Sequence, residues 1–160
     1  MMFYQINIED KNEKYDREVC SRMLWYGYSK ELNHEVTNIP RWQIDLIEEI
    51  LLSIEGNKEK IESNKLRAVE NLIVRKIEPE QIKYNCNVDD KYIEKVKKDL
   101  KINEYGSLDY YKNTLFRIKE KCDDNIYVDI KDEVICVTEE NKKDLIENIE
   151  KIILQLKDNV

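Results

Sequence analysis

The stretch IEPEQIKYNCNVDDKYIEKVKKDL, residues 77–100, decides the fold of the middle of the chain. Its first half opens with Pro79, which is pre-organised for the first position of a helix. Its second half follows Asp89, whose side chain can accept a hydrogen bond from a free N–H group at a helix start. Between them lies Asn87, and asparagine adopts the left-handed backbone of a tight turn more readily than most residues. The stretch therefore predicts two short helices, the first over Pro79–Asn85, joined by a tight turn.

Helical periodicity extends to both sides of this stretch. Apolar residues recur at steps of three or four in five further segments, which predicts helices with one apolar face each. The positions are Tyr15, Val19, Met23 and Tyr26; Trp42, Leu46, Ile50 and Ile54; Leu66, Val69 and Ile73; Tyr111, Leu115, Ile118 and Cys122, after a capping Ser107; and Leu145, Ile149, Ile152 and Leu156, after Thr138. The centre of the chain is therefore expected to be mostly helical.

Strand signals stand near the two ends of the chain. Phe3–Ile8 alternates apolar and polar residues, which is typical of a strand. Ile126–Ile130 and Val134–Val137 predict a hairpin that turns at residues 131–133. A lone hairpin is marginal in water, so we expect the N-terminal strand to complete a small three-stranded sheet, covered by the last helix.

The predicted fold class is therefore α+β, with a mostly helical centre and a small sheet. The length of 160 residues suits one compact domain over residues 1–160, with a helical sub-lobe at 40–101 and a hairpin-plus-helix sub-lobe at 107–160. Lysine occurs 21 times against six arginines, asparagine 15 times, and alanine once. Such usage follows AT-rich codons, so we expect the gene to come from a low-GC bacterium, its phages or its plasmids.

The charge and the cysteines exclude several classes of protein. The net charge of −7 repels phosphate backbones and anionic membranes, and Arg75–Lys101, with net +2, is the one mildly basic region. The four cysteines lie far apart with no CxxC pair, which disfavours a structural zinc site. Neither a signal peptide nor an apolar run of about 20 residues is present. We therefore expect a cytoplasmic protein with free thiols, no cofactor, no metal and no membrane contact.

Two catalytic alternatives can be built from the residues. Asp129 and Lys131 form a D-x-K element of the kind found in metal-dependent nucleases, with Asp109, Asp123 or Asp124 as a further carboxylate ligand. However, Lys131 falls where the hairpin is expected to turn, and charged turn residues are ordinary.

The second catalytic alternative pairs the Cys20 thiol with His34 as its base. Cys20 lies on the apolar side of its predicted helix, so a buried structural thiol is the favoured interpretation. No Gly-rich loop that could hold a phosphate is present. The protein is therefore predicted not to be an enzyme.

Residues 77–100 resemble the generic bacterial helix-turn-helix segment. Its matching positions are Glu80, Ile82, Val88, Asp89 and Ile93. Similar segments occur in sigma-factor region-four-like domains, small regulators and transposase-type nucleases. The resemblance implies nucleic-acid binding by the second helix, through a face made of Lys91, Lys95, Lys97, Lys98 and Lys101.

The same segment departs from a DNA-binding pattern at several positions. Lys83, Asn85 and Asn87 replace the usual small, apolar and glycine residues. Asp89 and Asp90 open the second helix, where a recognition helix meets bases and phosphates, and two carboxylates there would be repelled. The second helix also has no arginine, the preferred reader of guanine. The residues thus favour a packed helical pair with a solvated lysine face.

An aromatic cluster supplies a candidate protein interface: Trp25, Tyr26, Tyr28 and Trp42. Consecutive helical residues point about 100° apart, so Trp25 and Tyr26 cannot both be buried on one face. Surface tryptophan and tyrosine are common anchors of protein interfaces. A core aromatic residue with its polar tip in water is the alternative.

These patterns favour a non-catalytic, acidic protein that acts by binding another macromolecule. A protein partner is favoured over nucleic acid, and a homodimer stays open. The AT-rich composition suggests an accessory protein of a phage or mobile element, such as an inhibitor of a host defence system or an immunity-type protein, whose acidic surface can occupy a basic channel. A helix-turn-helix regulator is the first alternative, and a metal-dependent nuclease is the second.

Overall fold

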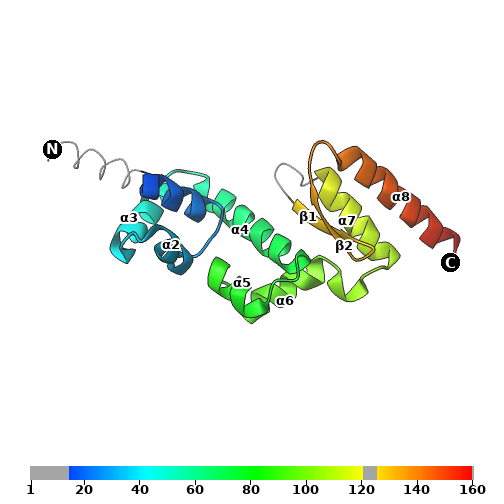
Figure 1. Cartoon of the computed structure of the whole chain (residues 1–160), viewed down its shortest axis with the longest axis horizontal. Coiled ribbons are helices and arrows are strands. Elements are labelled where there is room, and N and C mark those ends of the chain that lie inside the picture. Colours follow the sequence, from blue (N-terminus) through cyan, green and yellow to red (C-terminus); the bar gives the residue numbers. More distant parts are fainter. Residues whose placement is uncertain (1–14, 121–125, 160) are drawn as a thin grey trace. The chain divides into compact units, whose positions relative to one another are not determined.

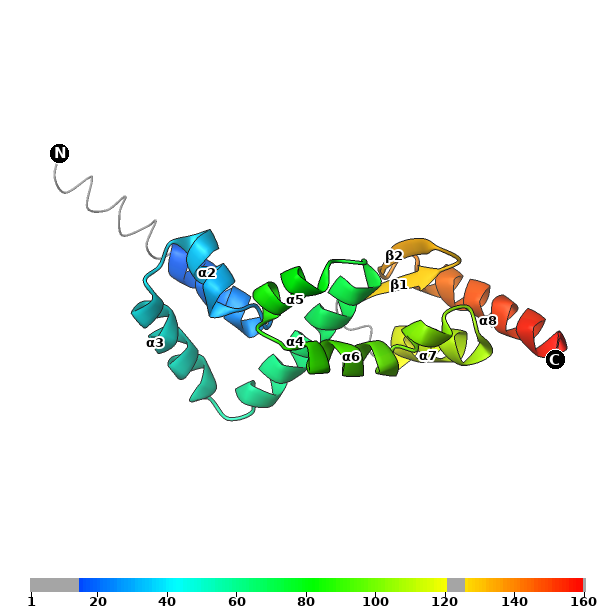
Figure 2. The same ribbon diagram turned by 90° about the horizontal axis from the view of Figure 1, so that it is seen from below.

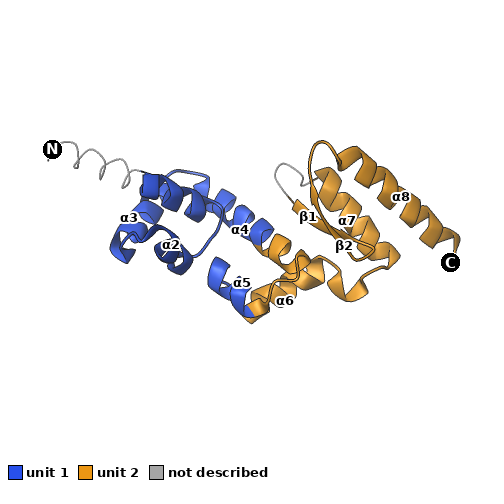
Figure 3. Ribbon diagram, viewed as in Figure 1, with its two compact units in different colours: residues 1–68, 80–88 blue, residues 69–79, 89–160 orange. Residues whose placement is uncertain are grey.

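The computed structural model describes residues 15–120 and 126–159. The chain forms two compact units that are interleaved in sequence (Figure 3). Unit 1 comprises Met1–Ala68 and Glu80–Val88, and unit 2 comprises Val69–Pro79 and Asp89–Val160. One helix, α4 (Asn57–Val74), begins in unit 1 and ends in unit 2. The single domain and the sub-lobes expected at 40–101 and 107–160 stay predictions.

Unit 1 is entirely helical in the part that the structure describes. Residues 15–25 form a first helix, followed by α2 (Lys30–Thr37), α3 (Arg41–Leu52), most of α4, and α5 (Pro79–Cys86). Its buried cluster consists of Cys20, Leu24, Ile39 and Ile44, with Ile47 and Leu51 packed against it. The core of unit 1 therefore joins the first helix to α3.

Gly27 allows the first helix to approach α4 closely. Its φ of +89° is in the left-handed region, and a Cβ added there would lie 2.4 Å from Cα of Lys65. Beside it, Asn64 Nδ2 donates a hydrogen bond to the Trp25 carbonyl oxygen at 3.0 Å. Only glycine leaves room for this contact between backbones.

Unit 2 contains α6 (Asp90–Asp99), a short 3₁₀ helix η1 (Ile102–Glu104), α7 (Leu108–Glu120), the strands β1 (Ile126–Ile130) and β2 (Glu133–Val137), and α8 (Lys142–Asp158). The strands pair antiparallel, with Ile126 opposite Val137 and Ile130 opposite Glu133. In two views the hairpin lies against α7 and α8 (Figures 1 and 2). The shared core contains Tyr110, Tyr111, Ile118, Ile126, Val128, Ile130, Val137, Leu145, Ile149, Ile152 and Ile153.

The end of α4 holds the outer edge of β1. Asn71 Oδ1 accepts a hydrogen bond from the Tyr127 backbone N–H at 3.0 Å, and the Arg75 guanidinium lies 4.9 Å from the centre of the Tyr127 ring. Glu70 forms a largely buried ion pair with Arg117 of α7 at 3.2 Å. The last turns of α4 therefore belong structurally to the sheet and α7.

The structure confirms an α+β, mostly helical fold, and the local prediction for residues 77–100. The two helices form, Asn87 has a φ of +52°, and Asp89 caps α6 by accepting from the Tyr92 N–H at 2.8 Å. Among the described residues the sheet has two strands rather than the three expected. The predicted strand Phe3–Ile8 lies outside the described residues. As expected, α8 packs against the hairpin.

Candidate protein-binding surface

Helix α3 has two apolar faces, and only one of them is buried. Ile44 is fully buried, and Ile47 and Leu51 pack beside it in the core of unit 1. The second face is open to solvent. We call it the α3 ridge; its members and exposed fractions are Trp42 (65%), Leu46 (48%), Ile50 (65%) and Ile54 (56%). Single exposed apolar side chains are common, whereas a contiguous apolar row marks an interaction surface.

Local contacts fix the ends of α3. The helix follows Pro40, whose carbonyl oxygen accepts the backbone N–H groups of Gln43 and Ile44. At the other end, the Ser53 hydroxyl donates to the Ile50 carbonyl oxygen at 2.6 Å, and Asn57 Nδ2 donates to the Leu51 carbonyl oxygen at 2.9 Å. The ridge is thus held on a helix whose C-terminal end has side-chain contacts and which is anchored by the buried Ile44.

A network of ion pairs joins α2 to α3 next to the ridge. Lys30 Nζ lies 3.0 Å from Asp45 and 2.9 Å from Glu48, and Arg41 lies 2.8 Å from Glu31 and 3.6 Å from Asp45. The hydrogen bond from Lys30 lowers the pKa of Asp45, and hydrogen bonds to Glu48 and Asp45 raise the pKa of Lys30. The network fixes the direction of α3 relative to α2.

The four predicted aromatic interface residues do not form one cluster. Tyr26, Tyr28 and Trp42 are exposed and Trp25 is half-buried, which agrees with the expectation that Trp25 and Tyr26 could not both be buried. Among the described residues, no ring–ring contact joins these four side chains. Trp42 instead belongs to the α3 ridge, which the aromatic pattern did not reveal.

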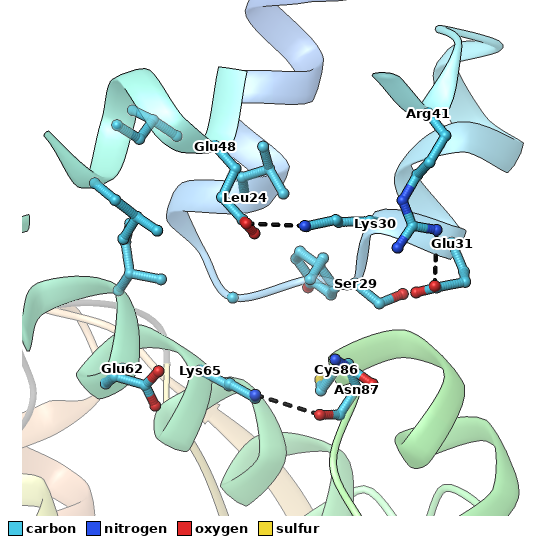
Figure 4. A pocket seen from close by; sticks show the side chains of 15 residues that line it. Leu24, Ser29, Lys30, Glu31, Arg41, Glu48, Glu62, Lys65, Cys86 and Asn87 are labelled. Carbon is cyan, nitrogen blue, oxygen red and sulfur yellow. Dashed lines mark hydrogen bonds and ion pairs between the residues drawn. The ribbon is translucent and has the colours of Figure 1, made fainter. Parts of the chain in front are cut away.

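A shallow pocket of about 240 Å³ lies within unit 1 (Figure 4). The loop before α2 and parts of α3, α4 and α5 line it, and Leu24 and Cys86 contribute apolar side chains. Two of the cations that line it are paired: Lys30 with Glu48, and Lys65 Nζ with the Asn87 carbonyl oxygen at 3.3 Å. The volume is below the roughly 300–1,000 Å³ that is typical of small-molecule sites.

The predicted lysine face is only partly assembled on α6. Lys91, Lys95 and Lys98 are exposed, and no ion pair to them occurs in the described part of the chain. Lys97 instead lies 3.8 Å from Glu94, and Lys101 follows the helix and lies 3.7 Å from Glu104. Three of the five lysines therefore remain available for an anionic partner.

Asp129, the central residue of the nuclease hypothesis, is held by contacts with other side chains of unit 2. It is buried, accepts a hydrogen bond from the Tyr105 hydroxyl at 2.7 Å, and lies 3.9 Å from Lys76 Nζ. Lys131 occupies a left-handed turn position with a φ of +52°. No group of three or more metal-binding side chains exists among the described residues, and Asp109 stands in the first turn of α7. Asp123 and Asp124 lie outside those residues.

The surroundings of the Cys20 thiol disfavour the reactive thiolate that a nucleophile needs. It is fully buried, and burial raises its pKa to about 11, which suppresses the reactive thiolate. His34 Nδ1 lies 2.7 Å from the Ile39 carbonyl oxygen, with which it shares a hydrogen bond. Both residues thus have structural contacts within unit 1.

Comparisons with protein-family models, with curated proteins and with solved structures found no match for this chain. None of the described helices is long and apolar enough to cross a membrane.

Proposed function

We propose that this protein acts without catalysis, by binding another protein through the α3 ridge. The observation that carries the proposal is the exposure of the whole ridge on a helix whose opposite face is already buried. Because the helix is anchored by Ile44, the ridge is not needed to hold unit 1 together.

Energetics support an interface at this position. Fully burying one large exposed apolar side chain contributes about 1.5–3 kcal/mol. The four ridge residues are 48–65% exposed, so each can supply roughly half of that on binding. Trp42 adds the residue type most enriched among energetic anchors of interfaces. The ordered ends of α3 reduce the entropy lost on binding, because the helix is formed beforehand.

The proposal includes an accessory role as an inhibitor or immunity-type protein. Such proteins work by occupying a partner's surface, and the net charge of −7 would complement a basic partner. This narrower role rests on charge and composition, and the ridge supports only the broader statement that a protein is bound.

Affinity capture tests the proposed function. The folded chain serves as bait in a nuclease-treated lysate at low and high salt, beside Leu46→Glu in the ridge and Leu154→Glu, which alters an exposed leucine on α8. We expect a stoichiometric protein partner that survives nuclease, is lost with Leu46→Glu and is retained with Leu154→Glu. Recovery of nucleic acid alone, released at high salt, would contradict the proposal.

A second candidate function is nucleic-acid binding by α6, favoured by the three exposed lysines without ion pairs in the described part of the chain. Glu94 and Asp99 on the same helix oppose it. Contacts with phosphates would make duplex binding fall steeply with salt. Lys95→Glu combined with Lys98→Glu should abolish such binding, and binding that persists in this variant would exclude α6 as the site.

A further inference from the structure

The α3 ridge is a single row of side chains spaced four residues apart. Trp42, Leu46 and Ile50 lie on the helix, and Ile54 comes after the C-capping Ser53. When rows of this kind from two helices fit into each other's grooves, the helices cross at about −50° with axes 8–10 Å apart. This is the commonest way in which helices pack in globular proteins. The ridge therefore has the form of one half of a helix–helix interface.

The neighbouring row on the solvent side carries opposite charges at its two ends. Arg41 stands at one end, Asp45 in the middle and Glu49 toward the other end, again at steps of four. Within the described part of the chain, Glu49 is exposed and no ion pair holds its carboxylate. A partner surface with an arginine opposite Glu49 and a carboxylate opposite Arg41 would match this row.

A second copy of α3 running antiparallel provides that surface. With a two-fold axis beside Leu46, each Leu46 meets its own copy and Trp42 meets Ile50 of the other chain. The same axis places Arg41 opposite Glu49 of the other chain, twice by symmetry. The start of each helix also lies beside the end of the other, so the helix dipoles attract.

We propose that the α3 ridge binds the α3 ridge of a second copy of this chain, forming a symmetric antiparallel dimer. This inference rests on the proposed function, because it names the partner of the same surface; the affinity capture then recovers an untagged second copy of the chain that is added to the lysate. An interface of this kind is self-complementary, and two-fold dimers are the commonest oligomers. The aromatic residues Tyr26 and Tyr28 and the pocket of unit 1 are then presented in two copies.

Two features work against this arrangement. Arg41 is already paired with Glu31 at 2.8 Å within its own chain, which weakens its attraction to Glu49 of the other chain. The second feature is Asp45. It would stand close to its own copy across the axis, and like charges repel there. Within each chain, however, Asp45 is paired with Lys30 at 3.0 Å and with Arg41 at 3.6 Å. These cations partly neutralise its carboxylate, so the repulsion is smaller than between two free carboxylates.

Molar mass in solution is the first test. Light scattering behind size exclusion should give twice the chain mass of 19.3 kDa, with the monomer appearing on dilution. Leu46→Glu, at the proposed axis, should weaken the dimer by roughly 30-fold or more, as expected for a central interface anchor. Leu154→Glu makes the same chemical change on exposed α8 and should leave the dimer intact. A monomer at every concentration, or a dimer that survives Leu46→Glu, would overturn the inference.

A charge exchange tests the antiparallel direction. Glu49→Arg alone should weaken the dimer because two arginines would then face each other, and Arg41→Glu alone should weaken it because two carboxylates would. The double variant restores opposite charges across the interface and should recover dimer strength. Circular dichroism checks that each variant is folded, since Arg41 also binds Glu31 within the chain. Failure of the double variant to recover would exclude this pairing.

Cross-linking tests the axis without disturbing charge. Leu46→Cys should form a disulfide between copies under mild oxidation, because the two Cα atoms would lie within the roughly 4.4–6.8 Å that a disulfide requires. Leu154→Cys should stay uncross-linked, and equal cross-linking of both variants would contradict a two-fold axis at Leu46. A monomeric chain that still captures a different protein through the ridge would refute the dimer and leave the proposed function standing. A monomer that captures nothing would refute both.

Discussion

Replacing Gly27 by alanine tests how unit 1 is held together. The added Cβ would lie 2.4 Å from the Cα atom of Lys65, whereas ordinary contact begins at 3.4 Å, so the first helix and α4 must separate by about 1 Å. Overpacking of this kind costs about 1–3 kcal/mol. The left-handed backbone, with a φ of +89°, adds about 1–2 kcal/mol for any residue with a Cβ. We therefore expect Gly27→Ala to lower the free energy of unfolding of unit 1 by about 2–5 kcal/mol.

Gly56→Ala is the matched control for this substitution. Gly56 is in the same unit and has a φ of +85°, but no atom lies within 4 Å of an added Cβ. Only the backbone cost of about 1–2 kcal/mol should remain. Urea unfolding followed by tryptophan fluorescence measures both variants, because Trp25 and Trp42, the two tryptophans of the chain, belong to unit 1. Equal losses of stability in the two variants would refute the close approach at Gly27.

Three further predictions concern buried groups. Arg117→Ala should lower the free energy of unfolding of unit 2 by about 3–5 kcal/mol in denaturant titrations, because it leaves the largely buried Glu70 carboxylate without its cation. Lys119→Ala removes an exposed ion pair with Glu150 and should cost under about 1 kcal/mol. Burial raises the pKa of Tyr110 from 10.0 to about 12, so its contribution to stability is complete below pH 10 and is lost as the pH rises toward 12. The absorbance of the Tyr110 phenolate, taken as the difference between the wild-type chain and Tyr110→Phe because the chain has ten tyrosines, should change together with near-ultraviolet circular dichroism in that range. A Tyr110 signal that changes at the ordinary pH without loss of structure would contradict this. Alkylation of Cys20 and Cys86 should be much slower in the folded protein than in urea, because burial raises the pKa of both thiols to about 11. Mass spectrometry of the labelled sites measures the two rates. Equal rates in the folded protein and in urea would contradict the burial of these thiols.

The features that sequence predicted best depend on near neighbours in the chain. Asn87 adopts the left-handed turn, Asp89 caps α6, and Ser107 Oγ accepts the Tyr110 N–H at the start of α7. Each of the two caps joins a side chain to a backbone group three residues away, and the turn depends on the conformation of Asn87 itself. The hairpin also formed where expected, although the turn is shorter, because Lys131 and Asp132 both take left-handed conformations and Glu133 already begins β2.

The candidate binding surface could not be predicted in the same way. The four-residue spacing of Trp42, Leu46 and Ile50 indicates an apolar face, but it does not say whether that face meets a core. The structure buries the opposite face, through Ile44, against the first helix. Which face of α3 is buried depends on contacts with Cys20 and other residues distant in sequence, so the periodicity within α3 cannot predict it.

The third strand stays a prediction. Phe3–Ile8 lies outside the described residues, so its expected place beside the hairpin is untested; the outer edge of β2 can be described on its own. In an antiparallel pair, alternate residues direct their backbone groups away from the partner strand. Asn141 Nδ2 already binds the Cys136 carbonyl oxygen on that edge. A third strand therefore has a shorter free edge to pair with than the length of β2 implies.

The interleaving of the two units also constrains the order in which they can form during synthesis. Unit 1 needs Glu80–Val88, so it cannot be completed until the intervening residues 69–79, which belong to unit 2, have left the ribosome. Those residues carry Glu70 and Asn71, whose partners Arg117 and Tyr127 are translated much later. At a synthesis rate of about 5–20 residues per second, several seconds pass between the synthesis of the end of α4 and that of the residues it contacts. A cut between Val88 and Asp89 would therefore not separate the chain into two self-sufficient halves, because the second half would lack the part of α4 on which β1 and α7 rest.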